Sequence, residues 1–253
     1  MKTSNNLSNM LKTAGLFLFS LAVMSSCNKD ETEVNNGTSI QFKSNYEAPV
    51  GTAGLKSTLS EGVIIESFKI NIEEIEIEFD DKDPLFATDS IATDYELEGP
   101  FEIDLVADGN ALETTIVNNV ELPVASYDEI EFKFRESENS ISEMLGKSLL
   151  VKGTINGTPF IFWTDEEIEV EIEFEEVFTL EEASIALLTV SFDIASLFDP
   201  AKGGIDLTSA SDGNENGIIE IYPGDPDGNN DLADMLWERL EDIIEAFEDS
   251  MDD

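Results

Sequence analysis

Two segments of this 253-residue chain alternate apolar and charged residues with a period of two. In the first segment the apolar positions shift by one place halfway along: they are Phe68, Ile70 and Ile72, and then Ile75, Ile77 and Phe79. Successive side chains of a strand point to opposite faces of a sheet, so a regular strand would turn the second half inside out. The pattern therefore predicts a strand with a β-bulge or bend at Glu73–Glu74, which returns the apolar residues to one face.

The second segment, residues 167–175, carries apolar residues on one face and like charges on the other. The apolar face consists of Ile168, Val170, Ile172 and Phe174, and the charged face of Glu167, Glu169, Glu171, Glu173 and Glu175. We expect a strand whose apolar face is buried and whose other face is strongly acidic.

Shorter strand patterns follow one another along the chain, with turn signals between them. They lie at residues 40–46, 101–105, 115–122, 127–134, 149–155, 158–164 and 187–192. Asn156-Gly157 between two of them predicts a β-hairpin, because both turn residues require positive φ. No repeat of 20 to 50 residues is present, which argues against a solenoid or propeller. We predict an all-β fold, an antiparallel β-sandwich of about eight strands over residues 40–198.

The C-terminal part, residues 199–253, has a different composition. Residues 199–230 are rich in Gly, Asp, Asn and Pro and predict an acidic loop. From Asp231 to Met251, apolar residues recur at helical spacing, which predicts a C-terminal amphipathic helix with Asp231 as its N-cap.

The N-terminal residues predict export and lipid anchorage. Residues 14–24 are apolar but too short to span a bilayer, so residues 1–26 are expected to be a signal peptide. LAVMSSC resembles the lipobox of bacterial lipoproteins, whose cysteine is lipidated, and this assigns lipidation to Cys27. The next residues, Asn28-Lys29-Asp30-Glu31, resemble the surface-export signal of Bacteroidota-type lipoproteins. Residues 27–39 are then a lipidated tether, and the expected localisation is the outer membrane, at the cell surface; the alternative is an ordinary secretory signal peptide.

The strand segments also resemble a family of bacterial surface lipoproteins of unknown function with a β-sandwich domain. The matching stretches are FKINIEEIEIEF, FEIDLVADG, LPVASYDEIEFKF and VKGTINGTPF, followed by an acidic strand and SFDIASLF, between Phe68 and Phe198. The resemblance implies a fold and membrane anchorage, and it implies no activity.

Charge limits the partners that this chain can bind. Without residues 1–26 it has 11 Lys and Arg against 56 Asp and Glu, a net charge of −45. Such a surface repels nucleic acid and anionic membrane and attracts cations. The excess of Asp and Glu has two explanations. Either these side chains form a solvated, charged surface, or some of them form dedicated cation-binding sites.

The residues needed for common enzyme chemistry are missing. The chain has no histidine, its one cysteine is Cys27, and it has no Gly-rich phosphate-binding motif. Carboxylate pairs could hydrolyse glycosides, but among 56 acids such pairs arise by chance. We therefore expect a protein that is not an enzyme.

One cluster matches half of a calcium-binding loop. Asp212, Asn214 and Asn216 precede Gly217 with the spacing D-x-[DN]-x-[DN]-G. Pro223 occupies the place of the usual bidentate glutamate, so the remaining ligands would be Glu220 and the backbone carbonyl of Ile218. A second acid-rich turn, Asp225, Asp227, Asn229 and Asp231, could hold a separate ion or share this one. The alternative is that both segments are Asx and glycine turns without an ion.

These observations predict a lipid-anchored, cell-surface, non-enzymatic binding or structural protein that calcium stabilises. Its expected partners are the membrane, through the N-terminal lipid, cations, and an extracellular glycan or protein, but not nucleic acid. The alternative function is a glycan-binding accessory, or a weak glycosidase, in polysaccharide capture. Aromatic side chains aligned on one sheet face would favour this alternative, and a purely acidic face would favour the first function.

Cys27→Ala tests the predicted anchorage. Because this substitution removes the only thiol that could be lipidated, the protein should leave the membrane fraction or keep its signal peptide. Cell fractionation and intact-mass measurement check this. An unchanged mature mass together with unchanged membrane association would contradict it.

Overall fold

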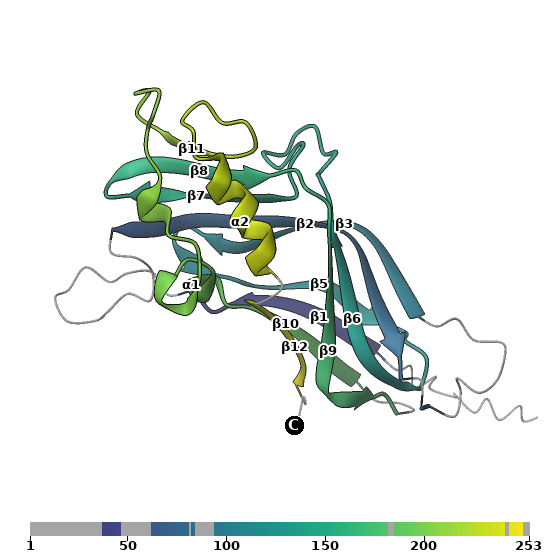
Figure 1. The fold of residues 1–253 in the computed structure, drawn as a ribbon. Helices are drawn as coiled ribbons and strands as arrows, with labels where there is room; N and C mark the ends of the chain where they lie inside the picture. Colours follow the sequence, from purple (N-terminus) through teal and green to yellow (C-terminus); the bar gives the residue numbers. More distant parts are fainter. Residues whose placement is uncertain are drawn as a thin grey trace, which may run out of the picture. The chain divides into compact units, whose positions relative to one another are not determined.

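The structure, a computed structural model, describes residues 37–46, 62–80, 82–83, 94–181, 185–240 and 243–249. Most of these residues lie in strands, which form two sheets (Figure 1). The fold is therefore all-β and sandwich-like, as the alternating patterns predict. Residues Val34–Asp253 form one compact unit. The expected signal peptide and Cys27 lie outside the described residues.

The larger sheet is organised around β2 (Val63–Phe79), a strand of 17 residues. One edge of β2 pairs with β3 (Asp94–Ala107), and β3 pairs in turn with the short strand β4 (Asn110–Ala111). Both pairings are antiparallel.

The other edge of β2 has two partners in succession, so the sheet forks. The first half of β2 pairs with β7 (Leu149–Ile155) and the second half with β6 (Ser126–Phe134). Beyond β7 the sheet continues through β8 (Thr158–Thr164) to β11 (Ile219–Ile221), and beyond β6 it continues to β9 (Ile168–Thr179). In Figure 1 the two branches leave β2 in different directions.

The predicted bulge lies at this fork. The register of β2 shifts between Ile72 and Glu74 against both β3 and β6, which confirms the prediction. Asn71 connects the two branches through its backbone and its side chain. Its N–H donates to the carbonyl oxygen of Ser148 on one side (2.9 Å), and its Nδ2 donates to the carbonyl oxygen of Arg135 on the other (2.8 Å).

The smaller sheet contains four strands in the order β12 (Ile244–Asp249), β10 (Ile185–Phe192), β1 (Gly37–Ser44) and β5 (Glu113–Val120). β1 and β10 run parallel, and β11 and β8 in the larger sheet do the same. The described residues thus form twelve strands in mixed sheets, more than the eight or so antiparallel strands expected. β1 begins at Gly37, three residues inside the expected tether.

Apolar residues of both sheets meet in one buried core. Phe42 of β1 packs edge to face on Phe132 of β6, with ring centroids 5.5 Å apart, and stacks on Phe192 at 5.8 Å. The helix α1 (Ile194–Leu197) leads to Phe198, which contacts the ring of Phe68. Both sheets therefore depend on the same aromatic contacts.

Turn chemistry accounts for the connections near β7 and α1. Asn156 and Gly157 have φ of 50° and 84° between β7 and β8, which confirms the predicted hairpin. Two short 3-10 helices, η1 (Pro200–Lys202) and η2 (Leu207–Ser209), follow α1.

The C-terminal helix is shorter than its pattern predicts. α2 covers Asn230–Leu240, so Asp231 lies in its first turn and is not the N-cap. The later residues form β12, which pairs antiparallel with β10. The edge of β10 offers unpaired backbone groups to this segment, and that pairing overrides the local helical spacing. Among the described helices, none is long and apolar enough to cross a membrane.

The contact between the sheets can be tested with a matched pair of substitutions. Phe132 is fully buried, so Phe132→Ala should lower the free energy of unfolding by about 3–5 kcal/mol. Ile141 is 95% exposed, so Ile141→Ala should change it by less than about 0.5 kcal/mol. Urea unfolding measures both, and equal effects would contradict the described core.

Candidate metal centre

Acidic residues from four neighbouring strands line up across one face of the larger sheet. Residues of β2 lie opposite acids of β3 on one side and opposite residues of β6 on the other, and those of β6 lie opposite glutamates of β9. The three resulting rows, which we call the acidic lattice, are Glu98–Glu74–Lys133–Glu169, Glu96–Glu76–Glu131–Glu171 and Asp94–Glu78–Glu129–Glu173. Eleven of the twelve positions are acidic.

The core on the opposite face forces these charges together. Ile75, Ile77, Ile130 and Phe132 alternate with the lattice residues and are fully buried. Because their burial fixes the register, the intervening charges must share the other face. Like charges directly opposite one another in a sheet destabilise it, so the lattice opposes the packing that creates it.

Lys133 is the one basic residue within the lattice. Its Nζ donates to Oε1 of Glu74 (2.6 Å) and to Oε1 of Glu76 (2.9 Å). These hydrogen bonds raise the pKa of Lys133, so it stays charged. Lys133 therefore compensates the first row and part of the second, but the third row contains no basic residue.

Glu131 lies in the middle row of the lattice, opposite Glu76 on one side and Glu171 on the other. It is only 7% exposed, and its Oε1 has no hydrogen-bond partner. Lys133 Nζ lies 3.8 Å from Oε1, which is close enough for an ion pair but too far for a hydrogen bond. Burial, together with the neighbouring Glu169 and Glu76, raises the pKa of Glu131 to about 8, although the nearby Lys133 acts in the opposite direction. Glu131 must therefore either keep its proton at neutral pH or be met by a cation.

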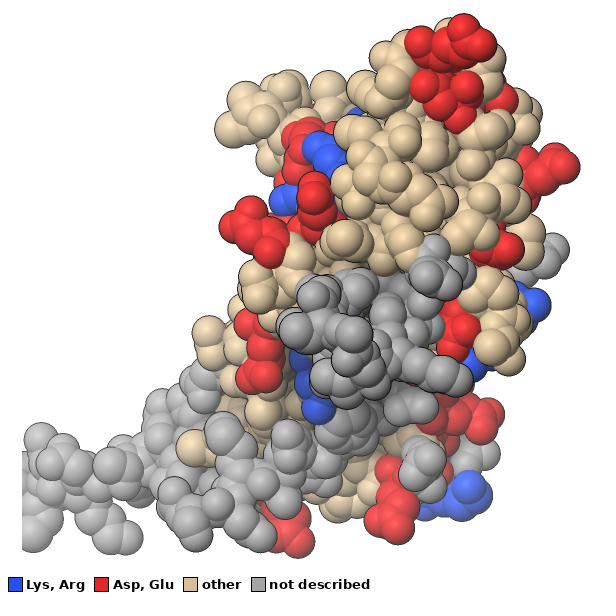
Figure 2. Space-filling model, turned by 90° about the vertical axis from the view of Figure 1, so that its left-hand side faces the viewer, with Lys and Arg blue, Asp and Glu red and all other residues tan. Residues whose placement is uncertain are grey.

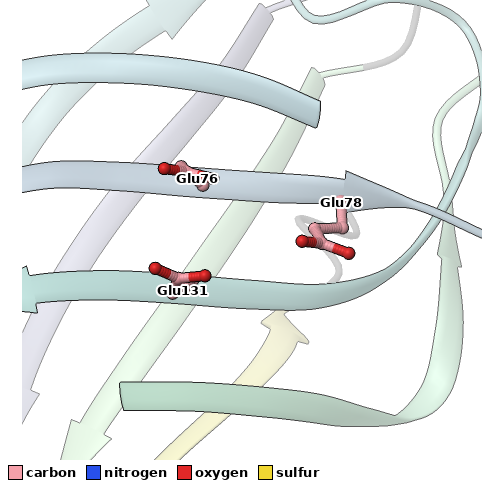
Figure 3. A group of neighbouring side chains, drawn as sticks. All are labelled: Glu76, Glu78 and Glu131. Atoms are coloured by element: carbon pink, nitrogen blue, oxygen red, sulfur yellow. The ribbon is translucent and has the colours of Figure 1, made fainter. Parts of the chain in front are cut away.

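Two groups of carboxylates in the lattice have the spacing of metal ligands, and both include Glu131. They are Glu76, Glu78 and Glu131, and Glu129, Glu131 and Glu171, each with ligand oxygens within 4.8 Å of one another. Figure 3 shows the first group on one side of β2 and β6, with Glu76 and Glu131 on adjacent strands. Ligand sets made only of carboxylate oxygens suit hard cations such as Ca²⁺.

The structure also brings together four of the predicted calcium ligands. Asp212 accepts hydrogen bonds from the N–H groups of Asn216 (3.0 Å) and Gly217 (2.8 Å). The amide groups of Asn214 and Asn216 both donate to Oε2 of Glu220, at 2.9 and 3.0 Å. Asp212, Asn214, Asn216 and Glu220 thus form one hydrogen-bonded loop.

Asp227, from the second acid-rich turn, closes this loop where Pro223 supplies no carboxylate. Its Oδ1 accepts from the N–H of Asn214 (3.0 Å) and its Oδ2 from the N–H of Glu220 (2.8 Å). The N–H of Ile218, the fifth predicted ligand residue, donates to Oδ1 of Asn216.

Asn229 and Asp225 hold the two turns together. Nδ2 of Asn229 donates to the carbonyl oxygens of Ser211 (2.9 Å) and Glu220 (2.7 Å). Oδ1 of Asp225 accepts three backbone N–H groups, while its buried Oδ2 has no partner. Residues 211–229 therefore form one structure, which we call the loop unit. In Figure 2 acidic side chains gather at the end of the domain where the loops around β11 lie in Figure 1.

Sequence reasoning found the loop unit but missed the lattice. The Glu-apolar alternation is visible in β2, β6 and β9 separately. Which glutamates face one another depends on the pairing order and register, which the alternation does not determine. The Glu-apolar alternation recurs in three segments of one sheet, and this recurrence is the sequence pattern that could have indicated the lattice.

The two tryptophans, Trp163 and Trp237, are candidate platforms for stacking on sugars. The indole ring of Trp163 stacks on Tyr222 at 4.8 Å, and Lys147 Nζ lies 5.5 Å from its centroid. The side chain of Trp237 lies outside those described. The lattice face of the larger sheet is acidic. This is the feature expected for a non-enzymatic binding or structural protein, and not the feature expected for glycan binding.

Comparison with known proteins gives no match to a family model, a curated protein or a solved structure.

The lattice predicts an unusual pH dependence of stability in a buffer that contains a chelator. Because the pKa of Glu131 is higher in the folded state than the ordinary value of 4.5, the folded state holds an extra proton between about pH 5 and 8. The free energy of unfolding should therefore fall as pH rises through this window, by up to about 1.4 kcal/mol per pH unit for one proton.

Urea unfolding between pH 5 and 9 measures this slope. Glu131→Gln cannot ionise and should flatten it, whereas Glu66→Gln, at an exposed position of β2, should leave it unchanged. A slope that is identical in the wild type and Glu131→Gln would contradict the prediction.

Proposed function

We propose that this chain is a lipid-anchored, cell-surface protein without enzymatic activity, in which calcium bound by the loop unit stabilises a β-sandwich domain. The domain acts outside the cell as a binding or structural module. The observation that carries the calcium proposal is the convergence of Asp212, Asn214, Asn216, Glu220 and Asp227 in one loop.

This convergence supports calcium binding because it supplies what the sequence motif lacks. A calcium ion takes six to eight oxygen ligands, often including a bidentate carboxylate. Pro223 breaks the motif at that position, and Asp227 brings a carboxylate to the same loop from the other turn. The N–H donors that fix Asp212 and Asp227 hold these carboxylates in place before an ion arrives.

The loop unit is also placed so that an ion would stabilise the fold. β11 lies within the loop unit and pairs with β8. The helix α2 begins directly after Asn229. An ion that binds only the folded loop would therefore stabilise one edge of the larger sheet and the start of α2.

The absence of enzymatic activity is supported by composition. A chain without histidine lacks the commonest general base and the imidazole metal ligand. Glycan capture has less support than calcium binding, because Trp163 already stacks on Tyr222.

The anchorage and surface location depend on the N-terminal resemblance to lipoproteins. Membership of an uncharacterised surface-lipoprotein family depends on the strand segments between Phe68 and Phe198. The extreme negative charge is compatible with a protein that is tethered by lipid and not by contact with anionic headgroups.

Calcium titration of the protein, followed by thermal unfolding, tests the loop unit. Millimolar calcium should raise the melting temperature, and Asp212→Asn should remove most of the increment that belongs to the loop. This substitution keeps one oxygen, which can accept one of the two N–H bonds that Oδ1 and Oδ2 of Asp212 accept, so the calcium-free protein should stay folded.

Asp165→Asn, an exposed substitution of the same kind between β8 and β9, is the matched control and should keep the full increment. Magnesium should give a smaller shift, since it demands a tighter octahedral site. An increment of the same size in Asp212→Asn would refute calcium binding by the loop.

A further inference from the structure

We propose that calcium binding by the loop unit controls the position of a second loop, residues 137–147, which lies between β6 and β7 and which we call the tip loop. The connection runs from Glu220 through the rings of Tyr222 and Trp163 to Lys147. The inference rests on the proposed calcium binding, and it states what that binding does to another part of the surface.

The tip loop carries the most exposed large apolar side chain among the described residues. Ile141 is 95% exposed, and Leu145 in the same loop is 48% exposed. Backbone hydrogen bonds close the base of the loop. The N–H of Ser137 donates to the carbonyl oxygen of Lys147 (3.0 Å), and the N–H of Gly146 donates to that of Ser137 (2.8 Å). A shift at the base therefore moves the apolar tip with it.

The side chain of Lys147 also holds the tip loop together. Its Nζ donates to the carbonyl oxygens of Glu143 (3.0 Å) and Leu145 (3.1 Å) within the loop. The same Nζ lies 5.5 Å from the ring centroid of Trp163 on β8, and the face of an indole ring attracts a cation. A shift of this ring therefore acts directly on the residue that ties the tip loop together.

The strand order of the larger sheet places the loop unit next to this ring. β11 pairs with β8, and β8 pairs with β7, which begins two residues after Lys147. Tyr222 directly follows β11, and its ring stacks on Trp163 with centroids 4.8 Å apart and an angle of 20° between the planes. Displacing one of these rings costs its contact with the other, so movement of Tyr222 reaches Trp163.

Glu220 is the residue through which a calcium ion acts on Tyr222. In the structure, Oε1 of Glu220 accepts the hydroxyl of Tyr222 (2.9 Å), and Oε2 accepts the amide groups of Asn214 and Asn216. A calcium ion competes with these donors for the same carboxylate, because it takes oxygen ligands. Its two positive charges also make the carboxylate a weaker acceptor for the hydroxyl. Calcium binding therefore loosens the hydrogen bond that fixes the ring of Tyr222.

The charges around Tyr222 support this coupling. Burial, the hydrogen bond to Glu220 and the charges of Glu220, Asp225 and Asp227 together raise the pKa of Tyr222 to about 12. All three carboxylates belong to the loop unit. A cation bound in the loop unit opposes the field of these carboxylates, so it changes the surroundings of Tyr222 even before any atom moves.

Tryptophan fluorescence measures the coupling. The chain has two tryptophans, so Trp237→Phe leaves Trp163 as the only one. Calcium is added to this variant in about 0.15 M sodium chloride, which screens general charge effects. The emission of Trp163 should change with the same midpoint as the melting temperature. In ¹⁵N-labelled protein, amide signals of the tip loop should shift in step with those of residues 211–229.

Three substitutions in the Trp237→Phe background make the test specific. Tyr222→Phe keeps the stacked ring and removes only the hydroxyl, so calcium should still raise the melting temperature while most of the response of Trp163 and the tip loop is lost. Tyr95→Phe removes a hydroxyl from β3 and, as the matched control, should keep the full response. Lys147→Met removes the ammonium group, so the emission of Trp163 should respond without a shift of the tip-loop signals.

The outcomes separate this inference from the proposed function. The inference is overturned if calcium raises the melting temperature and shifts the signals of residues 211–229 but leaves Trp163 and the tip loop unchanged. An equal response in Tyr222→Phe and its parent also overturns it. If calcium changes neither the melting temperature nor the signals of residues 211–229, the proposed calcium binding is wrong, and the coupling is wrong with it.

Discussion

The change of hydrogen-bonding partner at Asn71 is the constraint on which the larger sheet depends. β2 pairs with β7 before this residue and with β6 after it, and the register shift between Ile72 and Glu74 follows directly. Without the shift, Ile75 and Ile77 would point to the solvent. With it, they face the core that Phe42 and Phe132 share, and the glutamates between them all point outward.

The acidic lattice is therefore a consequence of apolar packing, and the magnitudes show why the sheet tolerates it. Burying one Ile or Phe side chain is worth about 1.5–3 kcal/mol. A like-charge pair across two strands costs a fraction of this, of the order of 0.2–1 kcal/mol. Burial thus determines the register. The repulsion remains as a smaller opposing contribution, which Lys133 reduces in the first row.

Much of this fold could be predicted from local patterns, because its strands are specified locally. The alternation predicted the bulge at Glu73–Glu74, and Asn156-Gly157 predicted its hairpin. What could not be predicted was decided by distant partners. The fork requires knowledge that β6 and β7 share one edge of β2, and the end of α2 at Leu240 depends on the free edge of β10.

The same distinction separates the two candidate sites. The loop unit is built from residues 211–229, so its residue types and spacing are visible in one stretch of sequence. The lattice joins residues from four strands, and its central residue, Glu131, belongs to an unremarkable Glu-apolar alternation. Only the register places Glu131 between Glu76 and Glu171.

The two sites also differ in what holds their carboxylates when no ion is bound. In the loop unit, backbone N–H groups donate to Asp212 and Asp227, so the ligands are stabilised and positioned by the chain itself. In the lattice, the neighbours of Glu131 are mostly acceptors, and the chain has few basic residues to offer. A cation at the loop therefore adds to an arrangement that is already stable. A cation at the lattice removes a repulsion, and so the lattice is the part of this domain whose stability should depend most on the ions around it.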